Sequence, residues 1–60
     1  MSKYQVNKIK QVMDFDAEQA EALIDLMEQI GAEPKWSGAT DNQLRNFFKL
    51  VLLGPSDDKQ

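Results

Sequence analysis

The clearest structural pattern in the chain lies in residues 16–31, DAEQAEALIDLMEQIG. In a helix, its apolar side chains fall on one side: Ala20, Leu23, Ile24, Leu26, Met27 and Ile30. Its acidic side chains fall on the opposite side: Glu18, Glu21, Asp25 and Glu28. Asp16 lies three residues before Gln19, which is the spacing of a capping box, and Gly31 suits the left-handed residue that ends many helices. The pattern predicts a helix over residues 17–30.

A second segment, residues 40–54, repeats the same signals. Thr40 lies three residues before Gln43, again the spacing of a capping box. The Gly-Pro pair at residues 54–55 is a strong stop, because glycine tolerates a left-handed cap and proline resists continuing a helix. One face collects the apolar side chains: Leu44, Phe47, Phe48, Val51 and Leu52. We predict a helix over residues 41–53.

The amino-terminal residues 3–13 carry a third helical pattern. Ser2 lies three residues before Gln5, and the apolar residues share one helical face: Val6, Ile9, Val12 and Met13. The valines and the isoleucine also suit a strand, since β-branched residues favour strands. Strict alternation of apolar and polar residues fails at Lys8 and Lys10, so a helix is favoured.

The connections define how the helices meet. Only residues 14–16 join the first two helices, which makes these helices antiparallel or sharply angled neighbours. Residues 31–40 form a longer connection, in which a proline and a glycine oppose regular structure. We expect Trp36 to fold over the edge of the core between the second and third helices. The prediction is an all-α, three-helix bundle forming a single domain over residues 1–53, with a polar flexible tail at 54–60.

The composition excludes several classes of protein. The chain has 60 residues, 42% hydrophobic and 28% charged, which is too apolar for a disordered polyelectrolyte. No apolar run approaches the length of a membrane span, and no apolar segment follows the first residues, so we expect a cytoplasmic protein without a secretory signal. The sequence contains no Cys and no His, which excludes disulfides, thiol catalysis and the commonest acid–base catalyst and metal ligand.

No catalytic motif is present, so we expect no enzyme activity, no cofactor and no metal site. Asp14 and Asp16 have the spacing of two carboxylates that could share a metal ion. Their position before a helix is explained without an ion, because Asp16 caps the helix and Asp14 lies near its positive end. The glycines are too few and too scattered for a phosphate-binding loop.

The acidic row on the second helix has two interpretations. Its members are Glu18, Glu21, Asp25 and Glu28. The simpler interpretation is the solvated face of an amphipathic helix. However, residues 14–33 carry seven acids and no Lys or Arg, whereas ordinary solvent faces mix both signs. The alternative is a protein-binding face that mimics phosphates or attracts the basic surface of a partner.

A second candidate protein-binding set is apolar. Leu50 and Leu53 fall outside the apolar face of the third helix, and Tyr4 falls outside that of the first. Trp36 joins the set because tryptophan and tyrosine are enriched at interface hot spots. These residues either cover the ends of the bundle or contact another chain, and pairing of two copies into a homodimer through Leu50 and Leu53 is equally allowed.

The third helix also carries side chains suited to reading DNA: Asn42, Arg45, Asn46 and Lys49. Against this, the net charge is −3, the acidic helix would repel phosphates, and the 31–40 connection is too long for a compact helix-turn-helix. We therefore predict a small, non-enzymatic regulatory protein that acts by protein–protein contact, of a build common among accessory or inhibitor proteins of bacteria and phages. A nucleic-acid-binding transcriptional regulator is the alternative.

Overall fold

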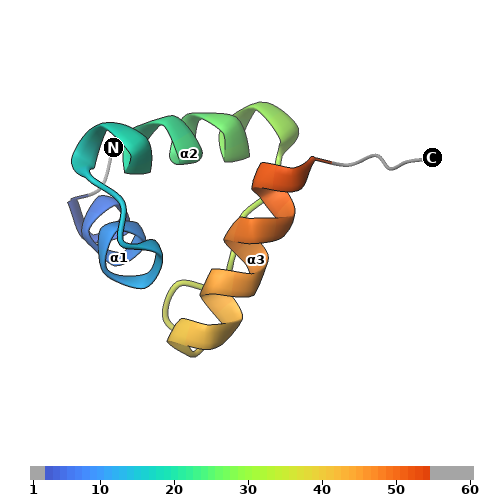
Figure 1. Cartoon of the computed structure of the whole chain (residues 1–60). Helices are drawn as coiled ribbons and strands as arrows, with labels where there is room; N and C mark the ends of the chain where they lie inside the picture. Colours follow the sequence, from blue (N-terminus) through green and yellow to red (C-terminus); the bar gives the residue numbers. More distant parts are fainter. Residues whose placement is uncertain (1–2, 55–60) are drawn as a thin grey trace.

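The computed structural model describes residues 3–54, and these residues form three helices. The helices are α1 (Lys3–Met13), α2 (Ala17–Ile30) and α3 (Asp41–Leu53), as shown in Figure 1. Within the described residues there is no strand, so the prediction of an all-α, three-helix bundle is confirmed, including a helix rather than a strand at the amino end. The expected cap at Ser2 and all but the first residue of the expected tail lie outside the described residues.

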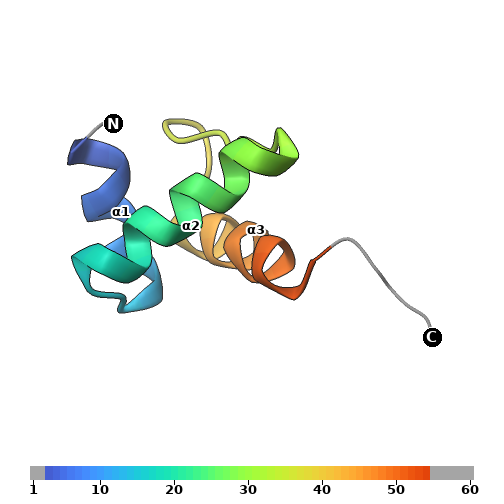
Figure 2. The ribbon, with the colours of Figure 1, turned by 90° about the horizontal axis from the view of Figure 1, so that it is seen from above.

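The three helices enclose one apolar core. Seen from above, α2 crosses α3, and the first half of α2 lies beside α1 (Figure 2). Nine apolar side chains form the core: Ile9 and Val12 from α1; Ala20, Leu23, Ile24 and Met27 from α2; and Leu44, Phe48 and Val51 from α3. Within residues 3–54 no polar or charged residue is buried, so the fold is held mainly by burial of apolar surface.

Two residues expected in the core are instead exposed. Ile30 is 49% exposed and Leu52 is 48% exposed, so their assignment to the buried faces was wrong. Both residues belong to the last turn of their helices, at the edge of the molecule where α2 and α3 end (Figure 1). The helical period places a side chain on a face, but it does not show whether a neighbouring helix reaches far enough to cover that turn.

Both capping boxes predicted within the described residues are formed. The Gln19 backbone N–H donates to the Asp16 carboxylate at 2.9 Å, and the Gln43 backbone N–H donates to the Thr40 hydroxyl at 3.1 Å. In each box the glutamine side-chain oxygen accepts from the backbone N–H of the capping residue. Each box satisfies backbone donors that would otherwise lack a helical partner.

We expect Thr40→Ala to lower the free energy of unfolding by about 1 kcal/mol, because α3 loses its capping oxygen. In a domain of this size, that loss lowers the melting temperature by roughly 4–8 °C. Thermal unfolding followed by circular dichroism measures the change. Ser37→Ala is the control, since Ser37 is exposed and caps no helix. Equal melting temperatures for the two variants would contradict a stabilising cap at Thr40.

Two glycines end helices in different ways. Gly31 has φ 71° and ψ 24°, the predicted left-handed conformation. Its N–H donates to the Glu28 carbonyl, and the Ala32 N–H donates to the Met27 carbonyl at 2.9 Å, which together make a Schellman motif. Gly54 instead has φ 89° and ψ 172°, a conformation that is also confined to glycine but is not a left-handed helical cap.

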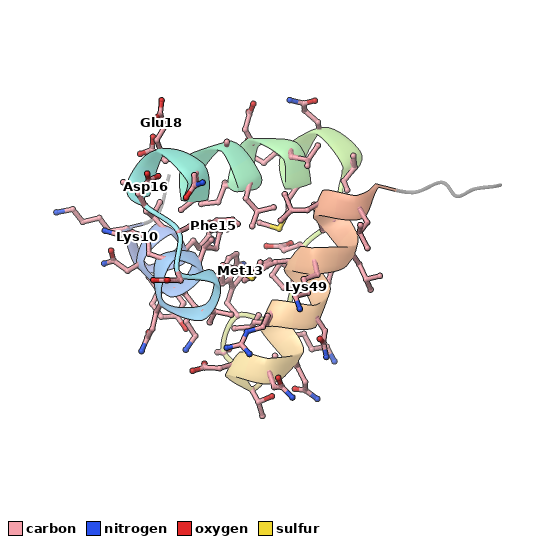
Figure 3. The ribbon with its side chains drawn as sticks, viewed as in Figure 1. Lys10, Met13, Phe15, Asp16, Glu18 and Lys49 are labelled. Atoms are coloured by element: carbon pink, nitrogen blue, oxygen red, sulfur yellow. The ribbon has the colours of Figure 1, made fainter. Side chains whose placement is uncertain are left out.

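The connection between α1 and α2 depends on Asp14. This residue has φ 60°, which is uncommon for a residue other than glycine and is enriched in Asp and Asn. The left-handed conformation of Asp14 reverses the chain within three residues, so Asp14 makes a turn, a role that the sequence did not reveal. Phe15 and Met13 on either side point toward the interior (Figure 3).

Candidate functional site

The most exposed large apolar side chains of α3 lie at its carboxyl end. Leu50 is 67% exposed and Leu53 is 77% exposed, in agreement with their predicted position outside the core-facing side. The two are one turn apart on the same helix, so their side chains are neighbours. Ile30 and Phe47 join Leu50 in lining a shallow groove of about 280 Å³. We call these four residues, Ile30, Phe47, Leu50 and Leu53, the apolar patch.

The sequence missed two members of this patch. Ile30 and Phe47 both lie on the apolar sides of their helices, and the pattern therefore assigned them to the core. Phe47 is half-buried, and its ring packs edge-on against the core ring of Phe48. The carboxyl ends of α2 and α3 lie together in the structure, and this arrangement places Ile30 and Phe47 next to the exposed Leu50.

Tyr4 and Trp36 do not belong to the apolar patch. The first turn of α1 and the last turn of α3 lie on opposite sides of the molecule in both views (Figures 1 and 2). The Tyr4 hydroxyl donates to the Trp36 carbonyl at 3.2 Å, and the two rings meet edge to face with centroids 6.4 Å apart. Trp36 also packs on Phe48, with centroids 5.8 Å apart. The half-buried Trp36 therefore connects residues 31–40 to α1 as well as to the core. Its contact with Tyr4 was not predicted from the sequence.

The acidic row of α2 is exposed along its whole length. Its four members, Glu18, Glu21, Asp25 and Glu28, all face solvent, and Glu18 points away from the bundle in Figure 3. The Gln29 side-chain amide donates to the Asp25 carboxylate at 3.2 Å. Within residues 3–54 none of the four pairs with a Lys or Arg. The row spans about 15 Å at the rise of an α-helix, and its charge is not neutralised by the described part of the chain.

The polar face of α3 is only partly free. Asn42, Asn46 and Lys49 are exposed, and Figure 3 shows Lys49 on the second half of α3. Arg45 is engaged within the fold, because its Nε–H donates to the Val12 carbonyl at 3.3 Å. A cation at the last turn of α1 also complements the negative end of that helix. The residue best suited to reading guanine therefore has one of its N–H donors engaged in the fold, although its side chain is exposed.

One ion pair joins α1 to α3 among the described residues. The Lys8 ammonium lies 2.9 Å from the Asp41 carboxylate, at the first turn of α3. The hydrogen bond that the Lys8 ammonium donates to Asp41, together with the charge of that carboxylate, raises the pKa of Lys8 above the usual value for lysine. Lys8 is half-buried and Asp41 is exposed, so solvent screens the pair and its contribution to stability is small.

No family model, curated protein or solved structure matches the chain. Within residues 3–54, no helix is long and apolar enough to cross a bilayer. The same residues hold no group of three or more carboxylates placed to share a metal ion. The function is therefore inferred from the surfaces of this chain.

Proposed function

We propose that this chain is a small, non-enzymatic regulatory protein of the cytoplasm that acts by binding another protein. The observation that carries the proposal is the apolar patch, where Leu50 and Leu53 expose most of their surface and Leu50 lines a groove with Ile30. Large apolar side chains gathered at one place on a surface mark sites of contact with other molecules. The absence of cysteine from the sequence is consistent with a reducing compartment.

The apolar patch supplies affinity, and the acidic row of α2 supplies selectivity. Fully burying one leucine contributes about 1.5–3 kcal/mol, so the two leucines together contribute roughly 3–6 kcal/mol toward binding a partner. A row of unneutralised carboxylates speeds the approach of a basic surface and disfavours acidic ones. We therefore propose a partner with both an apolar site and basic residues.

Nucleic-acid binding through α3 is less well supported. Arg45 donates its Nε–H to a backbone carbonyl of α1, so it would have to give up that hydrogen bond to bind guanine through this nitrogen. The net charge of −3 also opposes phosphate binding. DNA or RNA binding that weakens steeply with added salt would revive this alternative.

The test of the proposal is Leu50→Asp combined with Leu53→Asp. We expect affinity capture from a lysate of the source cells, followed by mass spectrometry, to lose the partner by at least about tenfold, since each tenfold loss corresponds to about 1.4 kcal/mol. Both leucines are exposed, so the helix content in circular dichroism should be unchanged.

The matched control is Asn42→Asp combined with Asn46→Asp. It makes the same change in charge on the exposed face of α3, away from the residues that line the groove. The control should capture the partner as the unmodified protein does. Equal capture by both double variants would rule out the apolar patch as the binding surface.

A further inference from the structure

A second hollow lies between α2 and the connection that follows it. It has a volume of about 310 Å³, at the small end of the range for ligand sites. Six of its lining residues define its chemistry: Ile24, Met27, Glu28, Glu33, Pro34 and Trp36. None of the residues that line it is a Lys or Arg. The sequence pattern did not reveal this hollow, because Glu28 comes from α2 whereas Glu33 and Trp36 come from the connection that follows it.

We propose that this hollow holds the side chain of a lysine or arginine from a basic segment of a partner protein. The buried side chains of Ile24 and Met27 contribute apolar surface, and the half-buried Trp36 and Pro34 contribute apolar walls. Lysine and arginine bury an aliphatic stem while keeping the charged group near polar atoms. The hollow offers both surfaces that such a side chain needs.

The charges of the hollow select a cation. Glu28 and Glu33 are both exposed at its border, and within residues 3–54 neither pairs with a basic residue. Carboxylates accept hydrogen bonds from ammonium and guanidinium groups, and the face of a tryptophan ring attracts the same groups. An anion in this position would face two carboxylates.

The parts of the hollow are fixed before any ligand binds. Gly31 and Ala32 close the Schellman motif that separates Glu28 from Glu33. Trp36 is held by the Tyr4 hydroxyl and by packing on Phe48. A preformed site loses less conformational entropy on binding than a flexible one.

A protein segment fits better than a free amine because the hollow continues the acidic row. Glu28 is the last member of that row and also lines the hollow. A partner with several basic residues would place one in the hollow and the others along the exposed carboxylates of α2. This assignment rests on the proposed protein-binding function and names the chemistry of the partner.

Trp36 is the one tryptophan of the chain, so its fluorescence reports on the hollow directly. The experiment titrates the 60-residue chain with an acetylated, amidated peptide of six arginines. We expect a saturable change in the Trp36 fluorescence, and no saturable change with a peptide of six glutamines. Absence of a saturable change with the arginine peptide would overturn the proposal.

Two double variants with equal changes in charge locate the site. Glu28→Gln with Glu33→Gln should weaken binding of the arginine peptide at least tenfold. Glu18→Gln with Glu21→Gln, which leaves the hollow intact and removes only two carboxylates of the acidic row, should weaken it by a clearly smaller factor. Equal losses would show only a general attraction of the acidic surface and would overturn the proposal. Binding of free arginine as tightly as the peptide would also overturn it in favour of a small amine.

The apolar patch provides the remaining comparison. Leu50→Asp with Leu53→Asp should leave the peptide titration unchanged, since neither leucine lines the hollow. If this variant loses the partner while the peptide fails to bind the unmodified protein, the proposed function stands and the hollow has no such role. If the peptide binds but the variant still captures the partner, the role proposed for the hollow is supported and the role proposed for the apolar patch is ruled out.

Discussion

Replacing Phe48 by alanine lowers the free energy of unfolding by about 3–5 kcal/mol, the largest effect that we expect from any single truncation in this chain. Phe48 has no exposed surface and is among the largest fully buried side chains. Its ring packs on Trp36 and Phe47, with centroids 5.8 Å and 6.0 Å away. Truncation therefore removes apolar contacts and leaves a cavity between α3 and the 31–40 connection.

A loss of this size is comparable with the total stability of the domain. At about 0.05–0.15 kcal/mol per residue, a chain of this length has roughly 3–9 kcal/mol. Urea unfolding followed by circular dichroism should show a much lower midpoint, and the Trp36 fluorescence should shift to the red as its neighbour is lost.

Leu50→Ala is the control for this measurement. Leu50 lies on the same helix but is 67% exposed, so its truncation should change the free energy of unfolding by no more than about 0.5 kcal/mol. If Phe48→Ala lowered the free energy of unfolding no more than Leu50→Ala does, Phe48 would not be packed in the core as described.

The helices of this protein could be predicted from local sequence because each carries its own signals. The capping boxes at Asp16 and Thr40 involve residues only three positions apart, so their geometry is contained in a short segment. The apolar period likewise depends on neighbours along one helix. These local signals were sufficient for the fold class and for the helix bounds.

The surfaces could be predicted only in part, because they depend on contacts between segments. Leu50 and Leu53 could be singled out, since no core-facing position was available to them on α3. The exposure of Ile30 could not be predicted, because it depends on where α3 ends relative to α2. Arg45 could not be assigned to the α1 carbonyl for the same reason, since its partner lies 33 residues away in the sequence.

Replacing Ala20 by leucine gives the second large effect that we expect. This substitution tests the packing of α2 by adding atoms to the core, whereas Phe48→Ala removes them. Ala20 has no exposed surface, although alanine is small, and the first half of α2 lies beside α1 (Figure 2). The added carbon atoms have no space without moving a helix or straining a rotamer. We expect the free energy of unfolding to fall by about 1–3 kcal/mol, measured by urea unfolding.

Ala22→Leu separates this steric effect from any effect of leucine on helix formation. Ala22 lies two residues away on the exposed side of α2, and leucine forms helices almost as well as alanine. The control should therefore unfold within about 0.5 kcal/mol of the unmodified protein. Equal stability of the two variants would mean that α2 does not pack closely at Ala20.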